Sequence, residues 1–204
     1  MLNNIADLTT RQQLPDAVSA LVAAMSIFER DTSMHLVATS VLAARIAARL
    51  DLEPIQIENC RIAAMLHDVG MLGINSTILT HPSMLSDPEW EILTEHSVLG
   101  AELLSVIPSL AHLAPIVRAH HERIDGSGYP DALIGEEIPI EARIIAVADA
   151  FHTMTIPTPY RSADATTSAM AELIGNAGTQ FDERVVDAFG TSVNYRRRLR
   201  RASG

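Results

Sequence analysis

The stretch AAMLHDVG, residues 63–70, places an imidazole and a carboxylate side by side at the end of an apolar run. Ala, Met and Leu are strong helix formers, so the run predicts a helix that ends close to Gly70. A histidine next to an apolar face is more often a satisfied core or surface residue than a ligand. His67 and Asp68 therefore need support from the rest of the chain before they indicate a functional site.

The composition predicts that helices continue through the whole chain. Apolar residues make up 48% of the 204 residues, whereas aromatic residues make up only 4%. Ala, Leu and Ile dominate the apolar set, which favours packed helices over a β-sandwich. No stretch rich in Pro, Gly or Ser divides the chain, so we expect one all-α domain with a substantial core.

Helix punctuation marks where the expected helices begin. Pro15 and Pro54 suit first-turn positions, and Ser86 and Glu89 have the spacing of a capping box. The expected helices cover residues 14–29, 32–50, 54–68, 87–105, 109–121, 139–156, 163–175 and 181–189. Residues 122–139 contain Gly126, Gly128, Pro130 and Gly135, which predicts a loop long enough to suspect a function.

Charge and cysteine usage exclude several classes of protein. The net charge of −10 argues against a DNA-binding protein, because such proteins need a basic surface to bind phosphates. Every cation is an arginine, and five arginines lie between Arg196 and Arg201, where we expect a solvated tail rather than a docking segment. Cys60 lies within an apolar helical pattern, which predicts a buried structural thiol. With no signal-like N-terminus and no apolar run of about 20 residues, we expect a cytoplasmic protein without a membrane span.

Other imidazole and carboxylate groups strengthen the case for His67 and Asp68. They recur at the apolar faces or ends of further predicted helices, at His35, His96, His120, His121 and Asp149. Polar groups in such positions make sense when a cation neutralises and orients them. The joint pattern therefore predicts a metal centre with mixed nitrogen and oxygen ligands.

The stretch HHERIDGSGYP, residues 120–130, closely resembles the motif of the HD-GYP family, bacterial hydrolases of cyclic di-GMP within the HD superfamily of metal-dependent phosphohydrolases. The resemblance continues, in the family's order, in residues 67–70, 95–100, 142–149 and 159–161. It implies an HD-type helical bundle with a metal centre in its core. It also divides the chain into an N-terminal helical segment (residues 1–30), the phosphohydrolase domain (31–190) and a basic tail (191–204).

The resemblance also implies roles for individual residues. The metal ligands it implies are His35, His67, Asp68, His96, His120, His121 and Asp149. Two divalent transition-metal ions are expected, with iron or manganese favoured over zinc. Asp31, four residues before His35, would serve a third ion as a shorter substitute for the family's glutamate. His67 and Asp68 are the expected catalytic residues, with the carboxylate of Asp68 as the natural bridge between two ions. Tyr160 and Arg161 are the residues expected to bind substrate.

Three positions depart from the family's pattern. The lysine that usually follows the His-Asp-x-Gly segment is Met71 here, and an arginine near the substrate is replaced by Thr158. Three residues after the last expected ligand the family usually has a second aspartate, and this chain has His152 there. The sequence allows His152 to be a surface residue, a hydrogen-bond partner of Asp149 or an extra metal ligand. Because two cations are lost from the substrate side, the expected binding of a dianionic substrate is weaker.

These observations support two functions of different classes. The first is a metal-dependent phosphodiesterase that hydrolyses cyclic di-GMP to a linear dinucleotide or GMP, or acts on another cyclic dinucleotide or a simpler phosphoester. The alternative is a catalytically feeble, metal-bound domain that senses a nucleotide or docks to a signalling protein. The sequence leaves a signalling-protein partner and a homodimer open.

Overall fold

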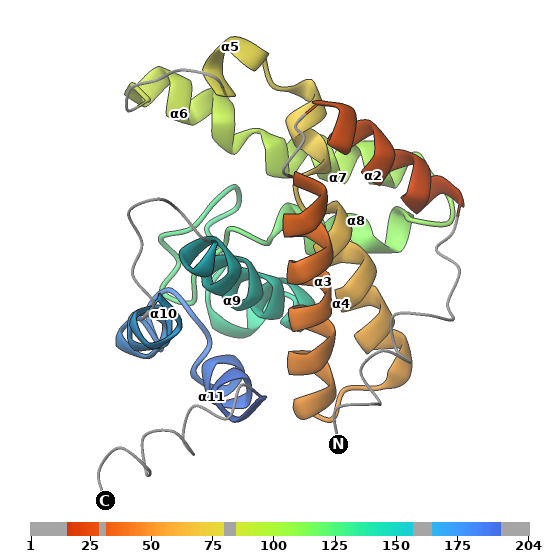
Figure 1. Cartoon of the computed structure of the whole chain (residues 1–204). Helices are drawn as coiled ribbons and strands as arrows, with labels where there is room; N and C mark the ends of the chain where they lie inside the picture. The colour runs from red at the N-terminus through yellow and green to blue at the C-terminus, as the bar shows by residue number, and fades with distance from the viewer. Residues whose placement is uncertain (1–15, 29–31, 80–84, 157–164, 193–204) are drawn as a thin grey trace, which may run out of the picture.

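The computed structural model describes residues 16–28, 32–79, 85–156 and 165–192, and every regular element in these ranges is a helix (Figure 1). The α-helices and 3-10 helices (η) follow one another in this order: α2 (Asp16–Phe28), α3 (Thr32–Arg49), α4 (Pro54–Leu66), η1 (Val69–Gly73), α5 (Ser76–Leu79), α6 (Asp87–Thr94), α7 (His96–Ser105), η2 (Ala111–Leu113), α8 (Ala114–Arg118), η3 (Gly135–Glu137), α9 (Ile140–Thr155), α10 (Ala165–Gly175) and α11 (Glu183–Ser192). The all-α prediction is confirmed for this part of the chain.

Two expected helices are shorter in the structure than the sequence suggested. The helix expected over residues 87–105 is broken at Glu95 into α6 and α7. The helix expected over 109–121 is η2 followed by α8, and it ends at Arg118. Pro115 lies in the first turn of α8, where its missing N–H costs nothing. Both corrections place a helix end two residues before a histidine, and the site described below gives the physical reason.

The helix starts inferred from punctuation are confirmed where the structure describes them. Pro54 occupies the first turn of α4. At the start of α6, the side chain of Glu89 accepts the backbone N–H of Ser86 at 2.8 Å, as expected for a capping box. Pro15 lies outside the described residues. Cys60 is buried, as predicted, and burial, followed by the charge of Glu141, raises the pKa of its thiol.

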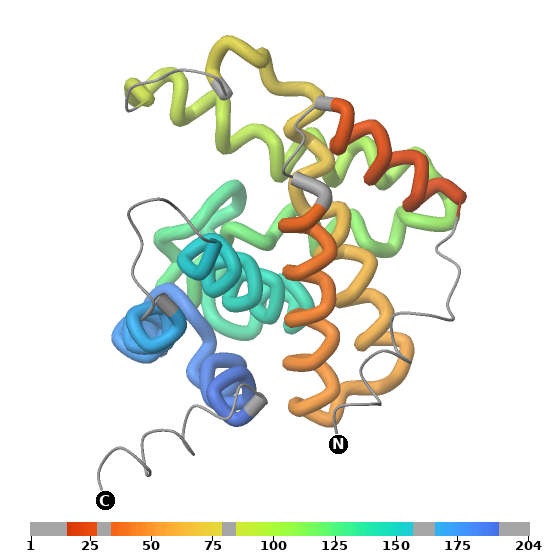
Figure 2. Tube along the Cα trace, in the orientation of Figure 1, coloured from red at the N-terminus to blue at the C-terminus, as the bar shows by residue number. Residues whose placement is uncertain are grey.

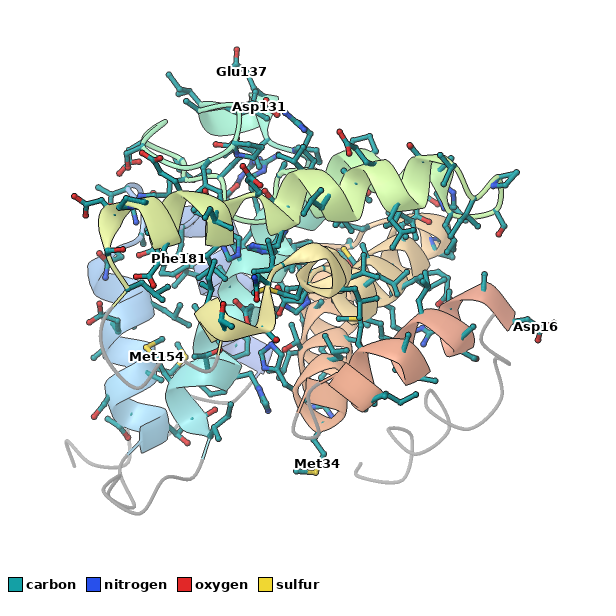
Figure 3. The ribbon with its side chains drawn as sticks, turned by 90° about the horizontal axis from the view of Figure 1, so that it is seen from above. Asp16, Met34, Asp131, Glu137, Met154 and Phe181 are labelled. Carbon is teal, nitrogen blue, oxygen red and sulfur yellow. The ribbon has the colours of Figure 1, made fainter. Side chains whose placement is uncertain are left out.

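Helices α3, α4 and α9 form the centre of the bundle. Figure 2 shows α3 and α4 lying side by side, and α9 packs against both. On one side α10 and α11 cover α9, and on the other side α7 pairs with α8 and contacts η1. Figure 3 views the molecule from above, with Asp131 and Glu137 of the 122–139 loop at the edge opposite Met34 of α3. The core therefore lies where α3, α4 and α9 meet.

Small residues let the central helices approach closely. Ala43 and Ala47 on α3 and Ala63 on α4 are fully buried, with larger side chains such as Ile46 between them. Buried positions on α3 recur every three or four residues, which is the period of one helical face.

None of the helices in the described ranges has both the length and the apolar composition that crossing a bilayer requires.

Gly70 controls the contact between η1 and α7. A Cβ atom at this position would overlap the carbonyl oxygen of His96 and the amide nitrogen of Gly100. Only glycine therefore allows the backbone that follows Asp68 to lie directly against the start of α7.

We expect Gly70→Ala to lower the free energy of unfolding by about 1–3 kcal/mol, because an added methyl group must push two backbones apart. Urea unfolding would measure the loss. Gly175→Ala is the matched control, since a Cβ there meets nothing within 4 Å and Ala favours helix. Equal unfolding midpoints for the two variants would contradict the close approach.

Candidate metal centre

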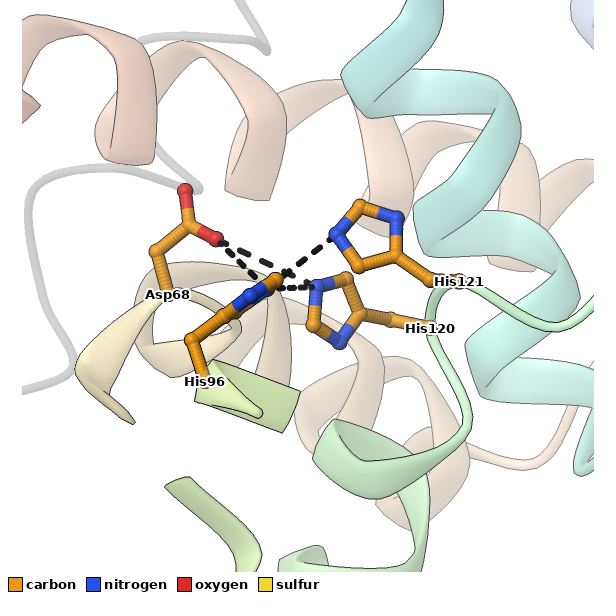
Figure 4. A group of neighbouring side chains, drawn as sticks. All are labelled: Asp68, His96, His120 and His121. Carbon is orange, nitrogen blue, oxygen red and sulfur yellow. Dashed lines mark hydrogen bonds and ion pairs between the residues drawn. The ribbon is translucent and has the colours of Figure 1, made fainter. Parts of the chain in front are cut away.

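All seven expected ligands converge in one cluster, although they come from distant parts of the chain. They are His35 on α3, His67 and Asp68 between α4 and η1, His96 at the start of α7, His120 and His121 just after α8, and Asp149 on α9. Figure 4 shows Asp68, His96, His120 and His121 facing one another from different elements. Three of the imidazoles, His67, His96 and His120, are almost completely buried.

Helix ends fix the orientation of these three buried rings. The Nδ1 atoms of His67, His96 and His120 lie 2.9, 2.6 and 2.5 Å from the carbonyl oxygen three residues earlier. Each carbonyl belongs to the last turn of α4, α6 or α8, where carbonyl oxygens have no partner within the helix. Because a carbonyl oxygen only accepts, each Nδ1 must carry the ring proton. In the neutral form of each ring, which is the form that binds a cation, Nε2 therefore presents a lone pair to the centre of the cluster.

The carboxylate of Asp68 faces two sets of histidines with its two oxygens. Its Oδ2 lies 3.1 Å from Nε2 of His67, and its Oδ1 lies 3.5 Å from Nε2 of His96 and 3.9 Å from Nε2 of His120. Two groups of ligand atoms that lie within 4.8 Å of one another share this residue. One consists of His35, His67 and Asp68, and the other of Asp68, His96, His120 and His121. This geometry suits a carboxylate that bridges two cations.

The contacts between histidine nitrogens support a cation in the second group. The Nε2 atoms of His96 and His120 lie 3.3 Å apart, and Nε2 of His121 lies 3.1 Å from Nε2 of His96. In the neutral rings of His96 and His120 both Nε2 atoms carry lone pairs, which repel at this distance. A shared cation converts that repulsion into attraction, so the donor set fits a divalent ion. Mixed imidazole and carboxylate ligands suit iron, manganese or zinc better than calcium.

Asp149 completes the first group from α9. Its Oδ1 lies 3.1 Å from Nε2 of His35 and 3.9 Å from Nε2 of His67, and the hydroxyl of Thr153 donates to it at 3.3 Å. His152, one turn later on α9, has its Nδ1 2.9 Å from Nδ1 of His35. The sequence reasoning missed this contact. The three-residue spacing between Asp149 and His152 indicated the correct helix face but could not identify a partner on α3.

The pKa values show how charge is distributed in the cluster. Burial opposes the charge on Asp68, but His67 and the other histidines hold its pKa well below the usual range. Burial also disfavours protonated His67, yet Asp68 outweighs burial and raises the pKa of His67 to about 9. Burial and then the proximity of His96 lower the pKa of His121 to about 3. At neutral pH the second group therefore offers a neutral His121 beside an ionised carboxylate, which is the protonation that cation binding needs.

Glu122 organises the loop that follows the histidine pair. Its carboxylate is buried and accepts the backbone N–H groups of Asp131 at 2.7 Å and Leu133 at 3.1 Å. A Cβ on Gly128 would overlap the backbone of Glu122 and Arg123, so glycine is required where the loop folds back. Glu122 was not among the residues predicted from the sequence, although a carboxylate directly after His120 and His121 was a signal that could have indicated it.

Tyr129 closes the loop over His121. Its ring lies 4.9 Å from the ring of His121 and 6.4 Å from that of Trp90, which is half-exposed on α6. Burial, followed by the charges of Asp68 and Asp149, raises the pKa of the Tyr129 hydroxyl, so the ring remains neutral. The half-buried ring of Tyr129 therefore lies between His121 and Trp90.

Several expected site residues lie outside the described residues. They are Asp31, Thr158, Tyr160 and Arg161. Met71 is described, and lies in η1, where its backbone N–H donates to the carbonyl oxygen of Asp68 at 2.9 Å. Met71, where the family usually has a lysine, thus closes the turn that begins at Asp68.

Comparison with known proteins agrees with the site. The family model described as HD domain matches residues 8–185. The chain is 39% identical over 175 residues to the cyclic di-GMP phosphodiesterase response regulator RpfG of Xanthomonas campestris, covering 85% of this chain and 46% of that protein. It is 33% identical over 178 residues to the 3'3'-cGAMP-specific phosphodiesterase 3 of Vibrio cholerae, covering 87% of this chain and 38% of that protein. The chain therefore spans less than half the length of these curated relatives.

The fold also matches a solved structure. The HD domain of the Listeria monocytogenes phosphodiesterase PgpH, crystallised with cyclic-di-AMP, superposes with a TM-score of 0.61 at 14% identity, covering 85% of this chain and 96% of that one. The HD-type helical bundle expected from the sequence is thus confirmed, as is the resemblance on which it rested.

Chelator-treated protein is expected to be most stable near pH 6.5, the ordinary pKa of histidine. The pKa of His67 is raised to about 9, so its stabilising contribution is complete below 6.5 and is lost as the pH rises through 9. The pKa of His121 is lowered to about 3, so the unfolded chain takes up a proton first and stability falls between pH 6.5 and 3. Urea unfolding across this range measures both losses. His121→Gln should make the fall on the acid side shallower without removing it, because burial also lowers the pKa of His120, and it should leave the alkaline side unchanged; an unchanged acid side would contradict the assignment.

Proposed function

The chain belongs to the HD domain family, and from this premise we propose that it is a metal-dependent phosphodiesterase acting on cyclic dinucleotides. The observation that carries the proposal is the position of Asp68, whose two oxygens face two separate sets of histidines. Phosphodiester hydrolysis requires charge stabilisation at the attacking, the transferred and the leaving oxygens, which a two-metal site supplies.

We assign the ligands to two cations. One cation would be held by His35, His67, Asp68 and Asp149, and the other by Asp68, His96, His120 and His121. Asp68 would belong to both ligand sets, and Nε2 of His67 lies 3.1 Å from its Oδ2, so these two residues would position the two cations relative to each other. Iron or manganese remains the expected metal, and a third ion at Asp31 remains a prediction from the sequence.

The cations would supply Lewis acidity toward the phosphoryl oxygens and hydroxide at neutral pH. The chain's own residues do the positioning. Helix-end carbonyls hold three imidazoles so that each Nε2 faces the centre, and Tyr129 covers His121 and limits water there. Tyr160 and Arg161 are proposed to bind a phosphate or base of the substrate, as the resemblance implies.

Cyclic di-GMP is the first substrate to test, because it is named for the relative RpfG at 39% identity. Other relatives and neighbours are named for 3'3'-cGAMP or were crystallised with cyclic-di-AMP, so both belong in the same panel. Met71 in place of lysine favours weak turnover, and the binding module remains the alternative. A cytoplasmic location, a signalling-protein partner and a homodimer stay predictions from the sequence.

The bridge assignment predicts different metal losses in two aspartate variants. Asp68→Asn should remove both cations, because the bridge serves both groups. Asp149→Asn should remove only one, because Asp149 contacts His35 and His67 alone among the ligands. Metal content per chain after reconstitution with manganese, measured by elemental analysis, makes the comparison. Equal losses in the two variants would show that Asp68 does not bridge.

Restoring the missing cation should increase turnover of cyclic di-GMP. A lysine at position 71 would place an ammonium in the turn that follows Asp68, near the cations that would hold the substrate's phosphate, and one charge-assisted contact of about 1.4 kcal/mol changes a rate about tenfold. Met71→Lys is therefore expected to raise kcat/KM about tenfold, whereas the neutral control Met71→Gln should not. The comparison is made as kcat/KM because a phosphate contact can act through KM alone.

Two outcomes would contradict this account. Brisk native turnover that Met71→Lys leaves unchanged would mean that another residue already performs the role of the lysine. The second outcome is that neither the native chain nor Met71→Lys hydrolyses any of the three cyclic dinucleotides while metal is bound. That result would reject the phosphodiesterase function and leave the binding module as the remaining function.

A further inference from the structure

The ring of His35 is held differently from the other inward-facing histidines. His67, His96 and His120 each place Nδ1 against a free carbonyl at a helix end. His35 lies in the first turn of α3, where carbonyl oxygens accept amides one turn later and only N–H groups are left without partners. Its Nδ1 instead lies 2.9 Å from Nδ1 of His152 on α9.

The geometry shows which nitrogen of His35 faces the metal ligands. Its Nε2 lies 3.1 Å from Oδ1 of Asp149, so Nδ1 is the nitrogen turned away from the cluster. The rings of His35 and His152 have centroids 5.0 Å apart and planes inclined by 51°, which is a tilted contact rather than a stack. Their contact is therefore a hydrogen bond between ring nitrogens, in which one Nδ1 donates and the other accepts.

We propose that His152 is a positioning residue for the metal centre: its Nδ1 accepts the Nδ1–H of His35 and leaves Nε2 of His35 free as a ligand. The proposal rests on the proposed metal site. A neutral imidazole carries one ring proton, so a proton on Nδ1 of His35 leaves a lone pair on Nε2. The opposite arrangement, with His152 donating, puts the proton of His35 on Nε2 against Asp149 and blocks ligation. His152 thus performs for His35 what helix-end carbonyls perform for His67, His96 and His120.

The contacts separate this role from the other roles open to His152. His152 uses its Nδ1 to contact Nδ1 of His35, which is the ring nitrogen of His35 that faces away from Asp149. A ligand role would need its Nε2 instead, which offers a direct experimental distinction.

Three substitutions of His152 test which atom acts. The amide oxygen of Asn occupies about the place of Nδ1, the amide oxygen of Gln reaches about the place of Nε2, and Leu offers no acceptor. We expect His152→Leu to weaken binding of one manganese ion by roughly 10–100-fold, the usual effect of removing a group that orients a ligand. His152→Asn should restore the affinity to within a few-fold, His152→Gln should not, and the other ion should bind as before. Affinity is measured by titrating the chelator-treated full chain with manganese, and electron paramagnetic resonance reports the concentration of free manganese at each step.

A second measurement reads the protons directly. In the zinc-loaded chain, nitrogen-15 spectra of the histidine rings should show His35 protonated at Nδ1 and His152 protonated at Nε2. Rescue by Gln but not by Asn, or a proton on Nδ1 of His152, would overturn the proposal. So would unchanged affinity in a His152→Leu variant whose urea midpoint matches the native chain.

The failure of this inference is distinguishable from that of the proposed function. A native chain that binds no manganese and no zinc rejects the metal centre and this inference with it. If the native chain binds two ions and a folded His152→Leu variant binds both ions with the same affinity, only the role of His152 is rejected.

Discussion

The carboxylate of Asp68 is the group on which the rest of the site depends, because both sets of histidines meet at it. Its oxygens lie 3.1 Å from His67 on one side and 3.5 Å from His96 on the other. Burying this many polar groups in an apolar bundle is unfavourable unless they are paired or hold a cation. The helices around the cluster are therefore constrained to bring imidazoles to one carboxylate, and Gly70 lets the chain beyond Asp68 lie against α7 closely enough to do so.

Helix ends, rather than helix interiors, deliver most of these rings. The last turn of a helix leaves carbonyl oxygens without partners, and an imidazole just beyond it can donate Nδ1–H to one of them. α4, α6 and α8 each end in this way, at His67, His96 and His120. The break at Glu95 and the early end of α8 follow from the same requirement. A continuous helix would use those carbonyls for its own amides and leave the rings without a fixed tautomer.

α9 and the loop after His121 complete the site by different means. α9 brings Asp149 to His35 and His67, and its His152 contacts Nδ1 of His35, a ring that lies in the first turn of α3 and has no free helix-end carbonyl. The loop is held by the buried carboxylate of Glu122, which accepts two backbone amides and keeps Tyr129 over His121. A single carboxylate thus orders the loop that covers the candidate metal centre, so its loss would disturb this loop without removing any of the seven clustered histidine and aspartate side chains.

The sequence by itself determined the helical class, the burial of Cys60, the capping box at Ser86 and the seven residues that converge. It could do so because helix propensity, apolar periodicity and cap spacing are local properties, and the histidine motif resembles a known family. Only the tertiary structure decided that α6 and α7 separate at Glu95, that Asp68 faces two groups, and that His152 contacts His35 117 residues away. Those features depend on which orphan carbonyl or ring nitrogen lies within hydrogen-bond distance once distant helices have packed. Spacing along one helix carries no information about that distance.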